Sequence, residues 1–265
     1  KEKEKKYVKL TLDHLFIEEK PIIPKWNFEF PSIFSQNKKN GTQLRTWIEK
    51  VDELTNDPTV EGLIINLKQV QASFSKRLEI RDALQRFKNS GKKIIVYSEQ
   101  TISNINYHLI SIADEIYINP LTGVDLKGMS LEVTFYRGLL DSLNIKPEVY
   151  RVNKDGKSYK GAADTFANTE LSEEMKEEYN KIFDDMYHVF VRDISEGRNW
   201  NESQTENAID NGPYLIAEQA IEAGLITGTM YPNEFKDYIK NNFKHKDNTS
   251  NKEEKDIKNT VSKLM

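Results

Sequence analysis

The side chains that most often perform catalysis or hold metals are scarce in this chain. Its 265 residues include no cysteine and only four histidines, His14, His108, His188 and His245. Without cysteine there is no disulfide, thiolate metal site or cysteine nucleophile. The wide spacing of the histidines is unlike that of zinc ligands. We therefore expect neither a metal nor another cofactor.

Several other kinds of site are excluded by missing motifs and by the charge balance. The sequence has no P-loop and no glycine-rich dinucleotide fingerprint after any apolar segment, which argues against nucleotide binding. It also lacks the Gly-x-Ser-x-Gly elbow of α/β-hydrolases. The 38 basic and 42 acidic residues give a net charge of −4, without the basic excess that is typical of nucleic-acid binding. The longest apolar runs, Gly62–Leu67 and Ile94–Tyr97, are far shorter than the roughly 20 residues that a transmembrane helix needs.

Apolar segments that alternate with helical periodicity indicate the fold class. Four segments predict strands of a buried sheet: Leu63–Leu67, Ile94–Tyr97, Glu115–Asn119 and Val149–Val152. Stripes of period 3.6 between and around them predict helices over 44–54, 80–87, 135–143 and 175–190. Ser172 is expected to cap the last of these helices. This order predicts an α/β fold with a mainly parallel sheet, repeated β-α-β units and flanking helices.

Composition divides the chain into three predicted parts. Residues 1–57 hold a strand at Tyr7–Ile17, a loop rich in proline and aromatic residues at Pro21–Phe34, and the first helix. Residues 58–240 form the α/β domain, and the polar residues 241–265 are expected to be a disordered tail. The Pro21–Phe34 loop either packs on its own domain or contacts a partner or a membrane. The chain begins at Lys1 rather than at methionine, so we expect that an upstream segment has been removed.

Three segments carry a resemblance to a known family. They are YHLISIADEIYINP at 107–120, FYRGLLDSLNIKPEVYRV at 135–152 followed by SYKGAA at 158–163, and the Gly-Pro-Tyr, Ala-Glu-Gln-Ala and Gly-Leu-Ile groups between 212 and 226. In this order and spacing they resemble signal peptide peptidase A, a family of membrane-anchored serine proteases with the ClpP/crotonase-like fold. The resemblance covers roughly residues 58–228.

The resemblance implies a catalytic lysine. In the long form of this family, an amino-terminal repeat supplies a lysine general base and a second repeat supplies the serine nucleophile. The chain resembles the amino-terminal repeat, and the family's Tyr-Lys pair falls on Tyr159-Lys160. The loop Asn153–Lys157 is longer than expected, so Lys157 or Lys154 is an alternative base. A lysine can act in this way only when burial lowers its pKa from about 10.4 by about 3–5 units.

The chain also departs from the serine-bearing repeats of the family. When Tyr107-His108 is aligned with the aromatic pair of the family's Ser-Gly-Gly-Tyr-Tyr stretch, Asn104–Asn106 stands where Ser-Gly-Gly is expected. Ser103 misses that position by one residue and is interpreted as a helix N-cap. The glycine-rich loop that would bind an oxyanion is replaced by Asn66–Val70. We therefore expect this chain alone to be inactive.

Two functions follow as hypotheses. In the first, the chain is the lysine-bearing half of a membrane-associated Ser/Lys peptidase that degrades cleaved signal peptides. The serine then comes from a second repeat or a partner chain, the enzyme is a ring-like homo-oligomer, and an anchor at the removed amino terminus holds it at the extracytoplasmic face of the cell membrane. In the second, the chain is a non-catalytic scaffold or interaction domain of the same fold. A crotonase-type acyl-CoA enzyme is disfavoured because no glycine-rich loop is present to polarise a thioester carbonyl.

Overall fold

The computed structural model describes residues 6–17, 42–150, 161–243 and 245–246. Its contacts divide the chain into two compact units. Unit 1 combines the residues up to Lys127 with those from Asp193 onward, and unit 2 is Gly128–Arg192. Each unit is described by itself below.

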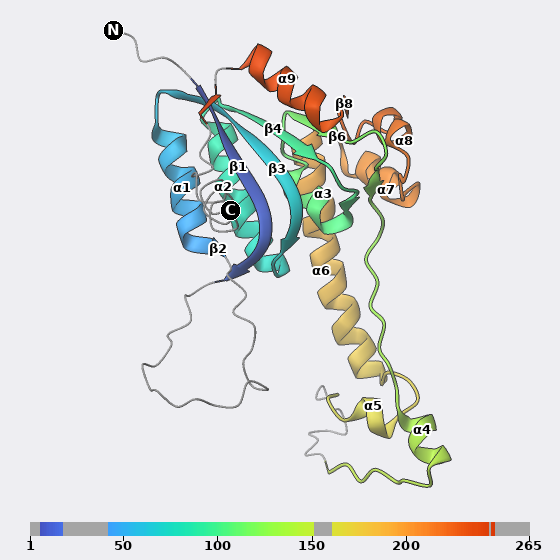
Figure 1. Cartoon of the computed structure of the whole chain (residues 1–265). Coiled ribbons are helices and arrows are strands. Elements are labelled where there is room, and N and C mark those ends of the chain that lie inside the picture. Colours follow the sequence, from blue (N-terminus) through green and yellow to red (C-terminus); the bar gives the residue numbers. More distant parts are fainter. Residues whose placement is uncertain (1–5, 18–41, 151–160, 244, 247–265) are drawn as a thin grey trace, which may run out of the picture. The chain divides into compact units, whose positions relative to one another are not determined.

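Unit 1 is built on a parallel sheet with the strand order β2-β1-β3-β4-β6-β8, and β9 pairs with β1 (Figure 1). The strands are β1 (Lys6–Ile17), β2 (Thr42–Gln43), β3 (Val60–Gln71), β4 (Lys93–Ser98), β6 (Glu115–Ile118), β8 (Gly228–Thr229) and β9 (His245–Lys246). A separate pair joins β5 (Ile102–Ser103) to β7 (Val124–Asp125), also in parallel. This architecture confirms the predicted α/β fold with a mainly parallel sheet.

Nine described helices accompany the strands. Unit 1 contains α1 (Leu44–Asn56), α2 (Phe74–Asn89), α3 (Asn104–Ile110), α7 (Glu202–Asp210), α8 (Ala217–Glu222) and α9 (Pro232–Asn242). Unit 2 contains α4 (Arg137–Ser142) and α5 (Asp164–Ala167), and α6 (Glu173–Arg198) begins in unit 2 and ends in unit 1. Figure 1 shows α1 and α2 together on one face of the sheet and α9 on the other.

The core of unit 1 explains why β3 and β4 are continuously apolar. Leu63, Ile64, Ile65 and Leu67 of β3 are almost fully buried, and Asn66 is partly buried. On the α9 side, Ile64 and Tyr97 join a cluster with Phe235 and Ile239, in which the rings of Tyr97 and Phe235 stack at 4.3 Å. Because helices cover both faces, the strands do not alternate with polar residues.

The predicted cap of α6 at Ser172 is confirmed, and small residues also lie at the ends of α2 and α3. Gly91 follows the C-cap of α2 with φ +82°, a left-handed conformation that glycine adopts without strain. Ser172 precedes α6 and its Oγ accepts a hydrogen bond from the Met175 amide at 3.4 Å. Ser103 is the N-cap residue of α3 as predicted, but its side chain makes no capping hydrogen bond.

The fourth predicted strand, Val149–Val152, is described only at Val149 and Tyr150, and these two residues do not form a strand. Pro147–Tyr150 has no regular structure, and the remaining residues of the predicted strand, Arg151 and Val152, lie outside the described residues. Val149 and Tyr150 are exposed, the latter by 91%. Proline removes a ladder donor, and the described residues of unit 2 include no strand to pair with this segment.

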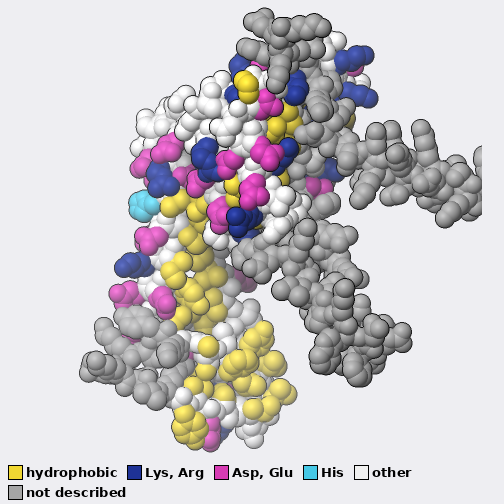
Figure 2. All heavy atoms as spheres, turned by 90° about the vertical axis from the view of Figure 1, so that its left-hand side faces the viewer, with side chains coloured by type: hydrophobic (Ala, Val, Ile, Leu, Met, Phe, Trp, Pro, Cys, Tyr) yellow, Lys and Arg dark blue, Asp and Glu magenta, His cyan; other side chains and the backbone are white. Residues whose placement is uncertain are grey.

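Unit 2 buries few apolar side chains. Its helix α4 confirms the predicted helix over 135–143, but no residue of α4 is buried. Exposed large apolar residues of this unit include Tyr136, Leu139, Leu143, Ile145 and Phe166. Figure 2 shows hydrophobic side chains gathered at the lower end of the view, at the height of α4 and α5 in Figure 1.

The described chain continues past the predicted start of the polar tail. Asn241 and Asn242 belong to α9, and β9 pairs with β1. The Phe243 ring lies 4.5 Å from that of Tyr7. Residues 247–265 and the Pro21–Phe34 loop lie outside the described residues.

Candidate functional site

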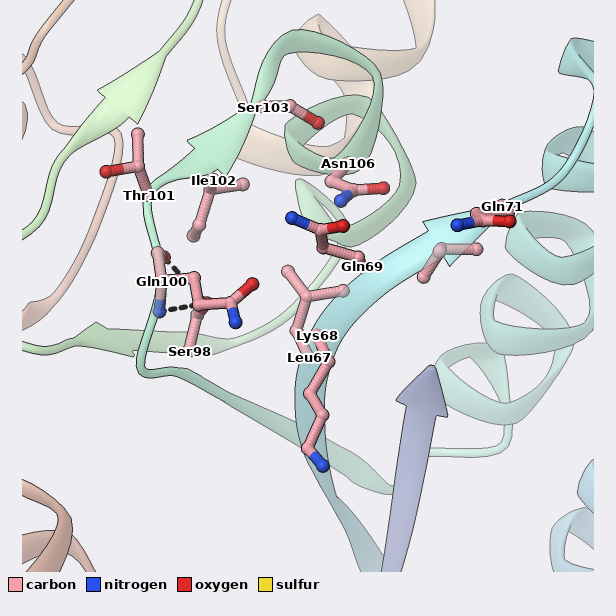
Figure 3. Close-up of a pocket in the computed structure, with 11 residues that line it drawn as sticks. Leu67, Lys68, Gln69, Gln71, Ser98, Gln100, Thr101, Ile102, Ser103 and Asn106 are labelled. Atoms are coloured by element: carbon pink, nitrogen blue, oxygen red, sulfur yellow. Dashed lines mark hydrogen bonds between the residues drawn. The ribbon is translucent and has the colours of Figure 1, made fainter. Parts of the chain in front are cut away.

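A polar cleft of about 260 Å³ opens in unit 1 at the carboxyl ends of β3 and β4 (Figure 3). In open α/β sheets, ligands bind beyond the carboxyl ends of the strands, where the chain leaves the sheet. Amide side chains and hydroxyls dominate the lining, which consists of Leu67, Lys68, Gln69, Val70, Gln71, Ser98, Gln100, Thr101, Ile102, Ser103 and Asn106.

The far wall of the cleft is positioned by a turn after β4. The Ser98 hydroxyl donates to the Gln100 carbonyl at 2.8 Å and accepts from the Gln100 amide at 3.2 Å. The chain then enters β5, which pairs with β7. Asn104 accepts a hydrogen bond from the Lys127 amide at 3.1 Å. These bonds place the first turn of α3 beside the cleft.

A buried arginine fixes the inner end of the cleft. Arg77 of α2 is only 7% exposed. Its Nη1 donates to Asn106 Oδ1 at 2.6 Å, its Nη2 to the Val70 carbonyl at 2.6 Å, and its Nε to the Ala72 carbonyl at 3.0 Å. Burial lowers the pKa of this guanidinium from its usual value. Arg77 thereby joins α3 to the end of β3.

A second buried cluster lies one helical turn farther along α2. Arg81 Nη1 donates to the His108 carbonyl and to Ser111 Oγ, and Nη2 contacts the Asp193 carbonyl. His108 Nε2 lies 2.9 Å from Asp193 Oδ2. Burial lowers the pKa of His108, although the hydrogen bond to Asp193 acts in the opposite direction. The cluster therefore links α2, α3 and α6 within unit 1.

Sequence reasoning missed both clusters, although a signal was present. Arg77 and Arg81 are four residues apart, on the same helical stripe as the buried Ile80 and Leu84. Charged residues on the apolar stripe of a helix are buried only when they are paired. Their partners come from distant segments, and the sequence pattern does not identify those segments.

The two segments that depart from the family pattern lie beside the cleft. Asn66–Val70 belongs to β3, which continues as a strand to Gln71 and is paired there with β1, and Asn104–Asn106 begins α3. Ser103 lines the cleft, and among the described residues Lys68 is the only lining residue with an amine. Lys68 Nζ lies 3.5 Å from Asp13 Oδ2, and Figure 3 shows its side chain pointing away from Ser103.

The predicted base Lys160, with its alternatives Lys157 and Lys154, lies outside the described residues. The segment that follows it in unit 2 is well packed. A Cβ on Gly161 would lie 2.5 Å from Met175 Sδ of α6, so a larger residue there would require the Met175 side chain to shift. Asp164 is 2% exposed, its amide donates to the Gly161 carbonyl at 2.9 Å, and its Oδ2 accepts from Ser172 Oγ at 3.4 Å.

Two searches of the described residues gave negative results. In the ranges given above, no group of three or more His, Asp or Glu side chains could hold a metal ion. None of the described helices is long and apolar enough to cross a membrane.

The parallel sheet, its flanking helices and the cleft at the strand ends define an α/β protein of the ClpP/crotonase-like class. Residues 86–246, more than half of the chain, match peptidase family S49. The chain belongs to this family, which confirms the resemblance to signal peptide peptidase A.

Individual relatives match only over part of their length. The chain is 30% identical to Protease 4 of Haemophilus influenzae over 63% of the chain and 26% of that protein. It is 29% identical to the chloroplastic serine protease SPPA of Arabidopsis thaliana, over 74% of the chain and 28% of that protein. It is 25% identical to Protease 4 of Salmonella typhi, over 64% of the chain and 27% of that protein. The chain thus spans about a quarter of the length of these relatives.

Proposed function

We propose that this chain is the lysine-bearing half of a serine peptidase that degrades cleaved signal peptides. The observation that carries the proposal is the cleft at the ends of β3 and β4. By the family resemblance, serine-bearing repeats hold their nucleophile and oxyanion loop at the positions of Asn104–Asn106 and Asn66–Val70, and in this chain these segments belong to α3 and β3 beside the cleft. The nucleophilic serine is then supplied by a second repeat or a partner chain.

In this proposal Lys160 is the general base. The packing of Gly161 against Met175 supports a fixed position for the segment that follows the lysine. In the assembled enzyme the surface of the serine-bearing partner desolvates the amine, because a neutral lysine is needed to take the proton of a serine. Asp155 and Asp164 must then leave Lys160 unpaired.

The exposed apolar residues of unit 2 support a partner and a homo-oligomeric assembly. Leu139 on α4 and Leu143, its C-cap residue, are 59% and 60% exposed, and apolar surface of this kind often marks a protein interface. We further propose that an upstream segment anchors the enzyme at the extracytoplasmic face of the cell membrane. The alternative is a non-catalytic scaffold, which the missing nucleophile also favours.

The test uses the complete protein that contains the serine-bearing repeat or partner. Lys160→Ala should reduce kcat for peptide cleavage by at least about 10³-fold while folding and assembly are preserved. Lys160→Arg should fail equally, because arginine cannot be deprotonated in proteins.

The matched controls are Lys157→Ala and Lys154→Ala, which should retain activity. If Lys157→Ala or Lys154→Ala is inactive while Lys160→Ala is active, the base is the lysine removed in the inactive variant, and the alignment of this loop with the family must be corrected. Wild-type cleavage by all three variants would reject the lysine-bearing role and favour the scaffold.

A further inference from the structure

A second groove of unit 1, of about 310 Å³, lies on the face of the sheet that α9 covers. Ile64 of β3 packs on this face in the core cluster with α9. Because successive side chains of a strand point to opposite faces, Asn66 lies on the same face as Ile64. The strand register places Thr11 of β1 and Tyr97 of β4 beside Asn66. This row of three residues forms the floor of the groove.

One side of the groove is the stripe of α9 that faces the sheet. The lining residues of α9 are Pro232, Phe235, Lys236 and Ile239. Phe235 stacks on Tyr97, and Ile239 belongs to the same buried cluster. The groove therefore has an apolar interior between the helix and the strands. Its volume is at the lower end of the range that is typical of small-molecule sites.

Asn66 is a polar residue in an otherwise apolar stretch of β3. Its neighbours Ile65 and Leu67 are almost fully buried, whereas Asn66 is partly buried. Its side chain makes no hydrogen bond to another described residue. Since partly buried polar groups normally have partners, this amide is available to a ligand in the groove. It can donate hydrogen bonds through its NH₂ group.

The charged residues of the groove are separated by sign. Lys9 lies on β1 and Lys236 on α9, whereas Glu99, the acidic residue among the described lining residues, directly follows β4. Because β3 lies between β1 and β4, Lys9 and Glu99 are on opposite sides of the groove. Lys236 is exposed and forms no ion pair with another described residue. An anionic group is therefore favoured at the lysines and disfavoured near Glu99.

We propose that this groove binds an aliphatic monocarboxylate of medium chain length. The hydrocarbon chain lies against the apolar interior beside Phe235, and its burial supplies most of the affinity. The carboxylate accepts a hydrogen bond from the Asn66 amide and is attracted by Lys236 and Lys9. Glu99 disfavours a second negative charge at the other end of the chain, so the groove selects monocarboxylates over dicarboxylates.

The direct test is calorimetric titration of the 265-residue chain with octanoate, for which saturable binding is expected. Hexanoate, which is shorter by two methylene groups, should bind about tenfold more weakly. Octanedioate, which adds a second carboxylate, and 1-octanol, which has no charge, should each bind at least about fivefold more weakly than octanoate. Absence of octanoate binding, or equal affinities for octanoate and any of these three compounds, would overturn the proposal.

Variants of the charged residues test where the carboxylate binds. Lys236→Gln should weaken octanoate binding about fivefold. The matched control is Lys240→Gln, on the same helix at an exposed position that does not line the groove, and it should bind like the wild type. Glu99→Gln should raise the affinity for octanedioate toward that for octanoate. Equal affinities of the two lysine variants for octanoate would overturn the assignment of the carboxylate to this groove.

A second pair of variants tests the apolar part of the site. Thr11→Trp fills the groove from an exposed position of β1 and should weaken octanoate binding at least about tenfold. Gln219→Trp places the same ring on the exposed surface of α8 and should leave binding unchanged. If both variants bind octanoate equally, the hydrocarbon chain does not lie in the groove and the proposal fails.

Two further measurements locate the ligand and identify its class. Bound octanoate should slow hydrogen exchange at the amides of residues 9–11 and 235–239, and protection confined to other segments would overturn the proposal. The competitor is acetyl-Ala-Leu-Leu with a free carboxylate, which should displace octanoate poorly. If this peptide binds more tightly than octanoate and is also weakened by Lys236→Gln, the ligand is the carboxyl end of a peptide and the assignment to an aliphatic monocarboxylate is wrong.

Discussion

The two units of this chain differ in where they place their apolar side chains. Unit 1 buries Ile65, Leu84, Ile94 and many more behind helices on both faces of its sheet. Unit 2 exposes the apolar residues of α4, and its segment Pro147–Tyr150 forms no strand. Burial of apolar surface is the main source of folding free energy. Unit 1 therefore carries most of the stability, and the apolar side chains of unit 2 are available to a partner.

The strongest test of this contrast is a pair of substitutions that delete similar side chains. Ile65→Ala removes a fully buried residue of β3 and should lower the free energy of unfolding by about 4 kcal/mol. Leu139→Ala on the exposed α4 should change it by no more than about 0.5 kcal/mol. Urea unfolding followed by circular dichroism measures both. A large loss for Leu139→Ala would mean that unit 2 has a core of its own.

The second test concerns the polar interior of unit 1. Arg77→Ala removes three hydrogen bonds and leaves the Asn106 and Val70 oxygens without this donor. We expect a loss of about 3 kcal/mol in the free energy of unfolding. The matched variant is Arg137→Ala in unit 2, whose guanidinium is paired with Asp141 on the surface. It should cost much less than Arg77→Ala, and equal losses would contradict the contrast.

Most of unit 1 could be predicted from the sequence, because its signals are local. The strands β3, β4 and β6 appear as short apolar runs, and α1 and α2 as stripes of period 3.6. Helices of this chain cover both faces of the sheet. An apolar residue in one of these strand segments is therefore buried within the fold. The same reasoning predicted a strand at Val149–Val152, where apolar residues are exposed in the described part. Val149 and Tyr150 are apolar, but no described strand pairs with them, so their hydrophobicity does not indicate a buried strand.

The candidate site was less predictable than the fold. The resemblance predicts that Asn104–Asn106 and Asn66–Val70 replace the nucleophile and the oxyanion loop, and this stays a prediction; the structure puts the first segment in α3 and the second in β3. The sequence did not indicate the cleft, because Arg77 and Asn106 are joined across 29 positions of the chain. Lys160 is recognisable only through the family resemblance, since nothing in its local pattern separates it from Lys157.

The third test uses pH and the histidines of the two units. Burial lowers the pKa of His108, while the unfolded chain titrates near about 6.5. As the pH falls from 7.5 through about 6.5, the unfolded state binds this proton before the folded state does. The free energy of unfolding therefore falls, by up to about 1.4 kcal/mol per pH unit from this residue, until the pH reaches the lower folded pKa.

Two variants isolate that contribution from the titration of the carboxylates. His108→Gln keeps a polar group beside Asp193 but cannot titrate, so its stability should fall less steeply between pH 7.5 and 5.5. His188→Gln makes the same substitution at an exposed position of α6 in unit 2 and controls for the change of side chain. If His108→Gln keeps the wild-type slope, the buried cluster holds a protonated histidine.

The smallest expected effect concerns the N-caps of two helices in unit 1. Asn201 caps α7, and Ser103 precedes α3 at the edge of the cleft. Asn201 forms a complete capping box with Gln204: its side chain accepts from the Gln204 amide at 2.8 Å, and the Gln204 side chain accepts from the Asn201 amide at 2.9 Å. Ser103 occupies the same position on α3 without a side-chain hydrogen bond to the helix. Asn201→Ala should therefore cost about 1 kcal/mol in the free energy of unfolding, and Ser103→Ala only a few tenths of that. Urea midpoints measured side by side resolve this difference, because both variants change one exposed polar residue to alanine. A cost of about 1 kcal/mol for Ser103→Ala would show that its hydroxyl caps α3 in solution. The N-terminus of α3 would then be stabilised in the same way as that of α7.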